Sequence, residues 1–143
     1  MITVFHIPVC PFCQRIEVLL ELKGQRHAVR TEVVDITVPR PDWLLELSGG
    51  STALPVLRTP DGRALKESLI LMRYLDSLLP RRIARPDPYE HAVEELFASR
   101  EGPFTAAGYR YVMNQDPARR DEHRQRLLDE YAALDALLMR YNP

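Results

Sequence analysis

The chain has 143 residues, of which 45% are hydrophobic and 27% are charged. It can therefore bury one substantial core but is too short for two ordinary domains. Its 19 Lys and Arg residues nearly balance its 20 Asp and Glu residues, so composition indicates no nucleic-acid partner. The apolar runs are too short to cross a membrane, and the first residues lack the basic start and long apolar stretch of a signal peptide. We expect a cytoplasmic globular protein without a membrane or nucleic-acid partner.

Both cysteines of the chain lie in one C-x-x-C motif formed by Cys10 and Cys13. The preceding residues 2–7 are β-branched and aromatic, which is typical of a buried strand. The apolar positions that follow recur at helical spacing and predict a helix over about 11–23, with Gly24 as its C-terminal stop. A C-x-x-C motif between a strand and a helix is typical of thiol redox chemistry.

Cys10 is the candidate nucleophile of this motif. A thiol at a helix N-terminus faces unpaired backbone N–H groups and the positive end of the helix dipole, which favour the thiolate. Cys13 lies one turn further on and could resolve a mixed disulfide at Cys10. Three other interpretations stay open, namely a structural disulfide, a zinc site and a pair of inert buried cysteines, although zinc would need two more ligands.

The rest of residues 1–80 predicts a small mixed sheet with helices on its faces. The expected elements are a strand over 27–36, a helix over 42–47, a hairpin of strands 54–58 and 63–66, and a helix that begins at Glu67 and Ser68 and runs to Pro80. The order is βαβα-ββα, and its right-handed βαβ unit places Cys10 at the carboxyl end of the first strand. Ligands of open α/β sheets bind at such ends.

Residues 81–143 predict a linker followed by helices. Residues 81–88 contain two prolines and read as the linker. Residues 89–112 are expected to be helical with a break at Gly102-Pro103, and a last helix is expected over about 117–141. An apolar stripe marks that last helix, at Leu127, Tyr131, Leu134, Leu138 and Tyr141. Two or three heptads without further repeat favour ordinary helix packing over a coiled coil.

Residues 1–80 resemble the glutathione transferases, most closely the omega class and related glutaredoxin-like members. The resemblance rests on Cys10-Pro11-Phe12-Cys13-Gln14-Arg15, Lys23-Gly24, Pro41-Asp42-Trp43, Leu54-Pro55-Val56-Leu57, and Glu67-Ser68 followed by Tyr74-Leu75-Asp76. It implies an α/β fold: a thioredoxin-like βαβαββα domain over 1–80, a linker over 81–88, and a partial all-helical domain over 89–143. That last segment corresponds to the first helices of a transferase second domain and is apparently truncated.

The resemblance also implies a glutathione site. It implies that Pro55 is cis and that the Leu54 backbone contacts the cysteinyl part of glutathione. Ser68 and Glu67 would hold the γ-glutamyl end through its carboxylate and its ammonium group. Arg40 matches a basic position near the glycine carboxylate, and Phe12 of the cysteine motif is included among the glutathione-binding residues. Ser68 could alternatively act only as a helix cap.

The activity implied by the resemblance is that of a glutathione-dependent thiol transferase. Cys10 would form a mixed disulfide with glutathione as co-substrate, without a metal, and dehydroascorbate reduction is a further family activity. The substrate would be a small-molecule or protein disulfide, and the family usually forms homodimers. Two alternatives stay open: a dithiol glutaredoxin-type reductase that uses Cys10 and Cys13, and a non-catalytic interaction module built on a transferase scaffold.

Overall fold

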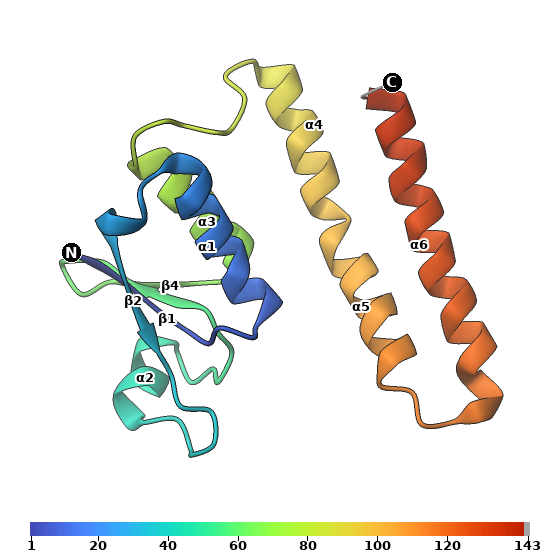
Figure 1. Cartoon of the computed structure of the whole chain (residues 1–143), viewed down its shortest axis with the longest axis horizontal. Coiled ribbons are helices and arrows are strands. Elements are labelled where there is room, and N and C mark those ends of the chain that lie inside the picture. Colours follow the sequence, from blue (N-terminus) through green and yellow to red (C-terminus); the bar gives the residue numbers. More distant parts are fainter. Residues whose placement is uncertain (142–143) are drawn as a thin grey trace. The chain divides into compact units, whose positions relative to one another are not determined.

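The computed structural model describes residues 1–141 and divides the chain into two compact units, Met1–Ile83 and Ala84–Pro143 (Figure 1). The boundary between these units falls within the expected linker, 81–88. The last two residues of the expected helical segment 89–143 lie outside the described residues. Each unit is described separately below.

The first unit contains a four-stranded sheet with the spatial order β2-β1-β3-β4 (Figure 1). β1 pairs parallel to β2, whereas β3 pairs antiparallel to both β1 and β4. The strands are β1 (Ile2–His6), β2 (Val29–Val33), β3 (Val56–Arg58) and β4 (Ala64–Lys66), and the helices are α1 (Pro11–Lys23), α2 (Asp42–Leu47) and α3 (Ser68–Leu78). The expected βαβαββα order is therefore confirmed.

Side chains of β1 supply a core on each face of this sheet, because successive residues of a strand point to opposite sides. Val4 packs in a cluster with apolar residues of α1 and α3, including Leu20 and Leu71. Its neighbour Phe5 packs in a second cluster with Leu44 of α2. Each fully buried aliphatic side chain contributes about 1.5–3 kcal/mol of stability. This packing fixes the ends of β1 and α1, where the cysteine motif lies.

The second strand is shorter than the sequence predicts. The prediction of a strand over 27–36 is wrong at both ends, because Arg26–Ala28 forms a 3-10 turn and β2 ends at Val33. Among the strands of residues 1–141, β2 pairs with β1 alone, and the register runs from Ile2 beside Val29 to His6 beside Val33. β2 therefore ends where its partner ends. The third strand likewise begins at Val56 rather than at the predicted residue 54.

A buried ion pair joins the C-terminal ends of α1 and α3. Lys23 is fully buried, and its Nζ donates to Asp76 Oδ1 at 2.6 Å, to the Asp76 carbonyl at 3.2 Å and to the Arg81 carbonyl at 2.9 Å. Asp76 Oδ1 also accepts from the Ile83 backbone N–H at 2.8 Å. The pair therefore anchors residues 81–83, the last segment of the first unit.

The second unit consists of α4 (Pro88–Ser99), α5 (Glu101–Val112), the short 3-10 helix Pro117–Arg119 and α6 (Arg120–Tyr141). The predicted break at Gly102-Pro103 is wrong by a few residues, since α4 ends at Ser99 and Arg100 separates it from α5. A proline inside a helix disrupts the turn that precedes it, but it is tolerated in the first turn. Pro103 lies in the first turn of α5, so the break between the helices comes before it, at Arg100. The last helix begins at Arg120, after the 3-10 turn, instead of at about residue 117.

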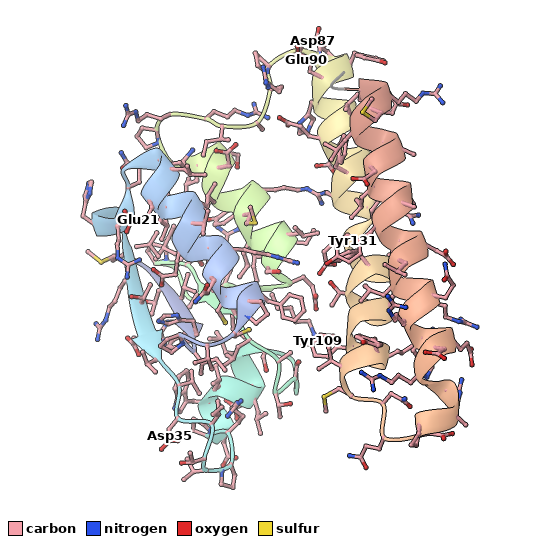
Figure 2. All side chains as sticks on the ribbon, turned by 45° about the vertical axis from the view of Figure 1, so that its right-hand side comes forward. Glu21, Asp35, Asp87, Glu90, Tyr109 and Tyr131 are labelled. Atoms are coloured by element: carbon pink, nitrogen blue, oxygen red, sulfur yellow. The ribbon has the colours of Figure 1, made fainter. Side chains whose placement is uncertain are left out.

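α6 packs against α5 along a face that matches the predicted stripe only in part. Leu127, Leu134 and Tyr141 are half-buried as expected. Tyr131 and Leu138 are 52% and 46% exposed. The ring of Tyr131, which is labelled in Figure 2, still packs edge-to-face on the Phe104 ring, with 4.9 Å between the ring centres. Within residues 1–141, no helix has the length and apolar character needed to cross a membrane.

Candidate functional site

Cys10 lies between β1 and α1 and is the N-cap residue of α1. Its backbone N–H donates to the Ile7 carbonyl at 3.2 Å, and its own carbonyl accepts from the Gln14 N–H at 3.0 Å. The side chain makes no capping hydrogen bond to the helix and is partly exposed. Cys10 therefore presents a partly exposed thiol at the start of α1.

Cys13 occupies a different environment one turn into α1. Its side chain is 1% exposed, and neither cysteine is in a disulfide. Burial raises the pKa of the Cys13 thiol to about 12; the hydrogen bond with the Ile7 backbone opposes this rise, and the smaller hydrogen-bond and charge effects of Cys10 add to it. Cys13 is therefore a protonated thiol at neutral pH. The two cysteines of one motif have different chemical states.

The Leu54–Pro55 peptide bond is cis, as the resemblance implies. It directly precedes β3, in which Val56 lies opposite Phe5 of β1. Because the two strands are antiparallel, Leu54 and Pro55 lie beside the end of β1 that leads to Cys10. Pro55 is buried, and Leu54 packs against the core cluster beneath α2. The fold thus brings the cysteine motif and the cis peptide together, although Leu54 follows Cys10 by 44 positions in the sequence.

Glu67 and Ser68 form the start of α3. Glu67 is the N-cap residue and has φ 70° and ψ 110°, a left-handed φ that costs a non-glycine residue about 1–3 kcal/mol. This backbone leaves the Glu67 side chain exposed, whereas the next residue, Ser68, is only 7% exposed. The pair therefore presents a carboxylate and a hydroxyl at the N-terminus of a helix that attracts anions.

Arg15 connects α1 to this helix start. Its Nη1 donates to Ser68 Oγ at 2.9 Å, and its guanidinium lies 4.9 Å from the centre of the Phe12 ring. In the sequence, Arg15 stands out only as part of the cysteine motif, which predicts no role for it. Since 53 residues separate the two hydrogen-bonded side chains, no local pattern could have revealed the contact.

Arg40 lies in the segment between β2 and α2 and is half-buried. Its Nε donates to the Thr52 carbonyl at 3.4 Å, and its Nη1 donates to the Asp35 carbonyl at 3.3 Å. Asp35, labelled in Figure 2, has a lowered pKa because the Thr37 hydroxyl and N–H bind its carboxylate, with a smaller contribution from Arg40. Arg40 thus joins the loop after β2 to the loop before Leu54, and a guanidinium with five donors has others to offer.

His6 is the last residue of β1, and the sequence predicts no role for it. It is 7% exposed, and its Nδ1 has no hydrogen-bond partner among residues 1–141 and lies 3.6 Å from Glu17 Oε1. Burial lowers the pKa of His6, and the charge of Arg26 lowers it further. His6 lines a cleft of about 840 Å³ that α1 and β2 also border. None of the predicted glutathione-binding residues lines this cleft.

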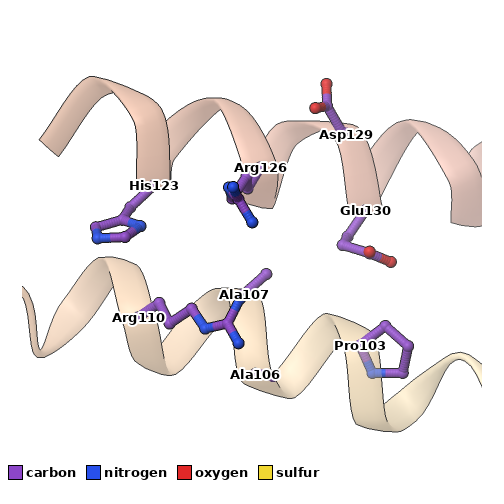
Figure 3. A pocket seen from close by; sticks show the side chains of 8 residues that line it. All are labelled: Pro103, Ala106, Ala107, Arg110, His123, Arg126, Asp129 and Glu130. Atoms are coloured by element: carbon purple, nitrogen blue, oxygen red, sulfur yellow. The ribbon is translucent and has the colours of Figure 1, made fainter. Parts of the chain in front are cut away.

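The second unit has a cavity of about 310 Å³ between α5 and α6 (Figure 3). Its charged lining includes Arg110 from α5 and Arg126 and Glu130 from α6, and His123 lies at one end. None of the residues that sequence predicts for the site lies there. Within residues 1–141, no group of three or more His, Cys, Asp or Glu side chains could hold a metal ion.

Comparison with known proteins gives a consistent family. Residues 9–78 match the family model described as glutathione S-transferase, N-terminal domain. The chain is 28% identical over 140 residues to pig glutathione S-transferase omega-1, covering 96% of this chain and 56% of that protein. It is 35% identical over 97 residues to the rat omega-1 enzyme, covering 66% of this chain and 38% of that protein.

Solved structures show the same fold. Glutathione transferase Omega 2C from Trametes versicolor aligns with a TM-score of 0.80 at 24% identity, over 96% of this chain and 61% of that one. A family member from Pseudomonas fluorescens, solved with bound glutathione, aligns with a TM-score of 0.72 at 22% identity, over 95% of this chain and 71% of that one.

The chain spans about half or less of the length of the two omega-1 relatives. Its first unit carries the matched N-terminal domain, with a thioredoxin-like sheet, and its second unit is helical like the segment that follows in those structures. The chain therefore belongs to the glutathione transferase family, with omega-class proteins among its relatives.

Proposed function

We propose that this protein is a glutathione-dependent thiol transferase in which Cys10 is the nucleophile. The observation that carries the proposal is the contrast between the two thiols of the motif. Cys10 is accessible at the N-terminus of α1, whereas Cys13 is 1% exposed and has a pKa raised to about 12. The family supports glutathione as the co-substrate, because a relative of the same fold was solved with it bound.

In the first step, the Cys10 thiolate attacks the glutathione sulfur of a mixed disulfide. A Cys10–glutathione disulfide forms, the substrate's S–S bond breaks, and the substrate thiol leaves as a thiolate that takes a proton from water. Cys10 is the N-cap residue of α1, so the attacking sulfur lies at the start of that helix.

In the second step, the thiolate of another glutathione attacks the glutathione sulfur now attached to Cys10. The Cys10–glutathione bond breaks, oxidised glutathione forms, and the Cys10 thiolate returns. The two steps together consume one glutathione thiol for each mixed disulfide: its sulfur pairs with the glutathione sulfur of the substrate to form oxidised glutathione, and the substrate leaves as a thiol. No other reductant is needed.

The state of Cys13 favours this monothiol cycle over the dithiol one. Resolution by Cys13 would require its thiolate, and burial is the largest cause of its raised pKa. Burial persists when Cys10 becomes a neutral mixed disulfide, although the charge of Cys10 is then lost. We therefore expect free glutathione, whose thiol is not buried, to resolve the intermediate in place of Cys13.

The site that we propose for glutathione follows the convergent segments of the first unit. The Leu54 backbone, fixed by the cis bond to Pro55, pairs with the cysteinyl part. Ser68 and the first N–H groups of α3 bind the γ-glutamyl carboxylate, and Glu67 binds the ammonium group. Arg40 serves the glycine carboxylate, and Phe12 lies beside the reacting thiol.

The decisive test compares Cys10→Ser with Cys13→Ser on a glutathione mixed disulfide of a small thiol. We expect Cys10→Ser to abolish turnover and Cys13→Ser to retain it. Loss of turnover in Cys13→Ser would instead support the dithiol reductase. Full activity in Cys10→Ser would overturn both enzyme mechanisms, and absence of turnover in the unaltered protein would favour the non-catalytic interaction module.

Dehydroascorbate serves as a second substrate in the same assay, with Cys10→Ser as its control. We also propose that the protein forms a homodimer, as the family resemblance suggests, and that it acts in the cytoplasm. Size-exclusion chromatography with light scattering tests the assembly, and a monomeric mass across the concentrations used for the activity assay would contradict it.

A further inference from the structure

We propose that Arg15 is a positioning residue of the glutathione site. It fixes the direction of the Ser68 hydroxyl so that this hydroxyl donates its proton to the γ-glutamyl carboxylate. The inference rests on the proposed function, because it assigns a task to a side chain that touches Ser68 rather than to a residue that touches glutathione.

The geometry places Arg15 between the thiol end of α1 and the start of α3. Its Nη1 lies 2.9 Å from Ser68 Oγ in a partly buried contact, and its guanidinium lies 4.9 Å from the centre of the Phe12 ring. Ser68 itself is 7% exposed and is the first residue of α3. One side chain therefore bridges the segment that carries Cys10 and the segment that would hold the γ-glutamyl group.

The chemistry of a hydroxyl explains why this contact directs binding. A serine hydroxyl has one proton to donate and two acceptor lone pairs, whereas a guanidinium can only donate. When Arg15 occupies a lone pair of Ser68, the Ser68 proton must point to a different acceptor. A charged donor also polarises the hydroxyl and strengthens the bond that it donates. Ser68 is thereby prepared to bind an anion beside the N–H groups of α3.

The side chain at position 15 also has to be an arginine for this arrangement. A planar guanidinium can stack on an aromatic ring while its edge donates hydrogen bonds, but a lysine ammonium has no plane to stack. Phe12 thus holds the guanidinium in place while the guanidinium holds Ser68. We therefore expect Arg15→Lys, which keeps the charge, to recover only part of the lost binding.

The experiment measures binding of reduced glutathione and of cysteinylglycine by calorimetry in the presence of a phosphine reductant. Cysteinylglycine lacks the γ-glutamyl group, so it reports the rest of the site. The variants are Arg15→Met, which keeps the aliphatic stem, Arg15→Lys, Ser68→Ala and the double variant Arg15→Met/Ser68→Ala. Arg30→Met is the control, because Arg30 is an exposed arginine of β2 whose Nε lies 3.0 Å from Glu32 Oε1.

We expect Arg15→Met to weaken the binding of glutathione about tenfold, which corresponds to the loss of one charge-assisted hydrogen bond. The affinity for cysteinylglycine should stay unchanged. The double variant should bind glutathione no more weakly than Ser68→Ala, because Arg15 acts through Ser68. Arg30→Met should bind both ligands normally. Thermal unfolding of every variant identifies any that is not folded, in which case Arg15→Lys supplies the comparison.

Three results would overturn the positioning role: an equal loss for both ligands, an additive loss in the double variant, or no loss in Arg15→Met. The proposed function fails in a different way. If the unaltered protein binds glutathione no more tightly than cysteinylglycine, the γ-glutamyl site is absent, and the role of Arg15 is rejected with it.

Discussion

The contrast between the two thiols leads to a quantitative prediction about alkylation. Cys10→Ser and Cys13→Ser each leave a single thiol, which iodoacetamide labels in its thiolate form. With a pKa of about 12, roughly one Cys13 in 10,000 is a thiolate at pH 8, compared with roughly one in four for a free cysteine of pKa about 8.5. Ionisation alone therefore slows Cys13 by about three orders of magnitude relative to a free thiol.

The assay follows the intact mass of each variant with time after iodoacetamide is added. We expect Cys13→Ser to be labelled at Cys10 within minutes at a reagent concentration that leaves Cys10→Ser almost unmodified. Substituting Cys10 removes its hydrogen bond and charge, but burial, the largest cause of the raised pKa, remains. A raised pKa also means that the Cys13 rate climbs about tenfold for each pH unit up to about 12.

In concentrated urea the two variants should react at similar rates, because the environment of α1 is lost. Labelling of the two native variants within tenfold of each other at pH 8 would refute the reasoning. It would mean that Cys13 is neither buried nor held protonated, and the argument against a dithiol cycle would be lost with it.

Three further predictions concern stability, each followed by urea unfolding with fluorescence of Trp43, the only tryptophan of the chain. Lys23→Met should lower the free energy of unfolding by about 3 kcal/mol, because it leaves the buried Asp76 carboxylate without its ammonium partner. The control Lys66→Met, at an exposed lysine, should change this free energy by less than about 0.5 kcal/mol. Similar losses in the two variants would contradict the buried ion pair. From pH 9 to 11 the unfolded chain releases the Cys13 proton while the folded chain keeps it, so stability falls with rising pH, and Cys13→Ala should remove about 1.4 kcal/mol of this fall per pH unit. The lowered pKa of His6 has the opposite sense, since the unfolded chain takes up a proton below about pH 6.5 that folded His6 resists; stability should fall as pH decreases through that range, and an equally steep fall in His6→Asn would exclude His6 as the cause.

The elements that the sequence predicts well are those defined by local signals. The helices over 11–23 and 42–47 are confirmed at both ends. For the first of these, Pro11 and Gly24 act within one turn of the helix that they delimit. The order of strands and helices follows from the same kind of signal, because each element has its own apolar period.

The predictions that fail depend on partners elsewhere in the chain. β2 ends at Val33 because its partner β1 ends at His6. The sequence of residues 27–36 contains no local signal for this end point. The stripe predicted on α6 includes Tyr131 and Leu138, but these two side chains stay exposed when α6 packs against α5. Apolar spacing indicates that a helix has a buried face without specifying which neighbour covers it.

The candidate site divides in the same way. Cys10, Pro55 and Ser68 could be singled out from short motifs, whereas the contacts of Arg15 with Ser68 and of Lys23 with Asp76 each join residues that are 53 positions apart. The difference between the two cysteines also required the structure, because burial of Cys13 depends on packing beneath α1.

The central claim is that Cys10 carries glutathione as a mixed disulfide during turnover. Its most direct test is rapid acid quenching of the protein after mixing with a glutathione mixed disulfide, followed by fragment mass spectrometry of the cysteine motif. We predict one glutathione on Cys10 in the unaltered protein and in Cys13→Ser, released by added glutathione at the rate of turnover. Accumulation of a Cys10–Cys13 disulfide, or glutathione on neither cysteine, would contradict the mechanism.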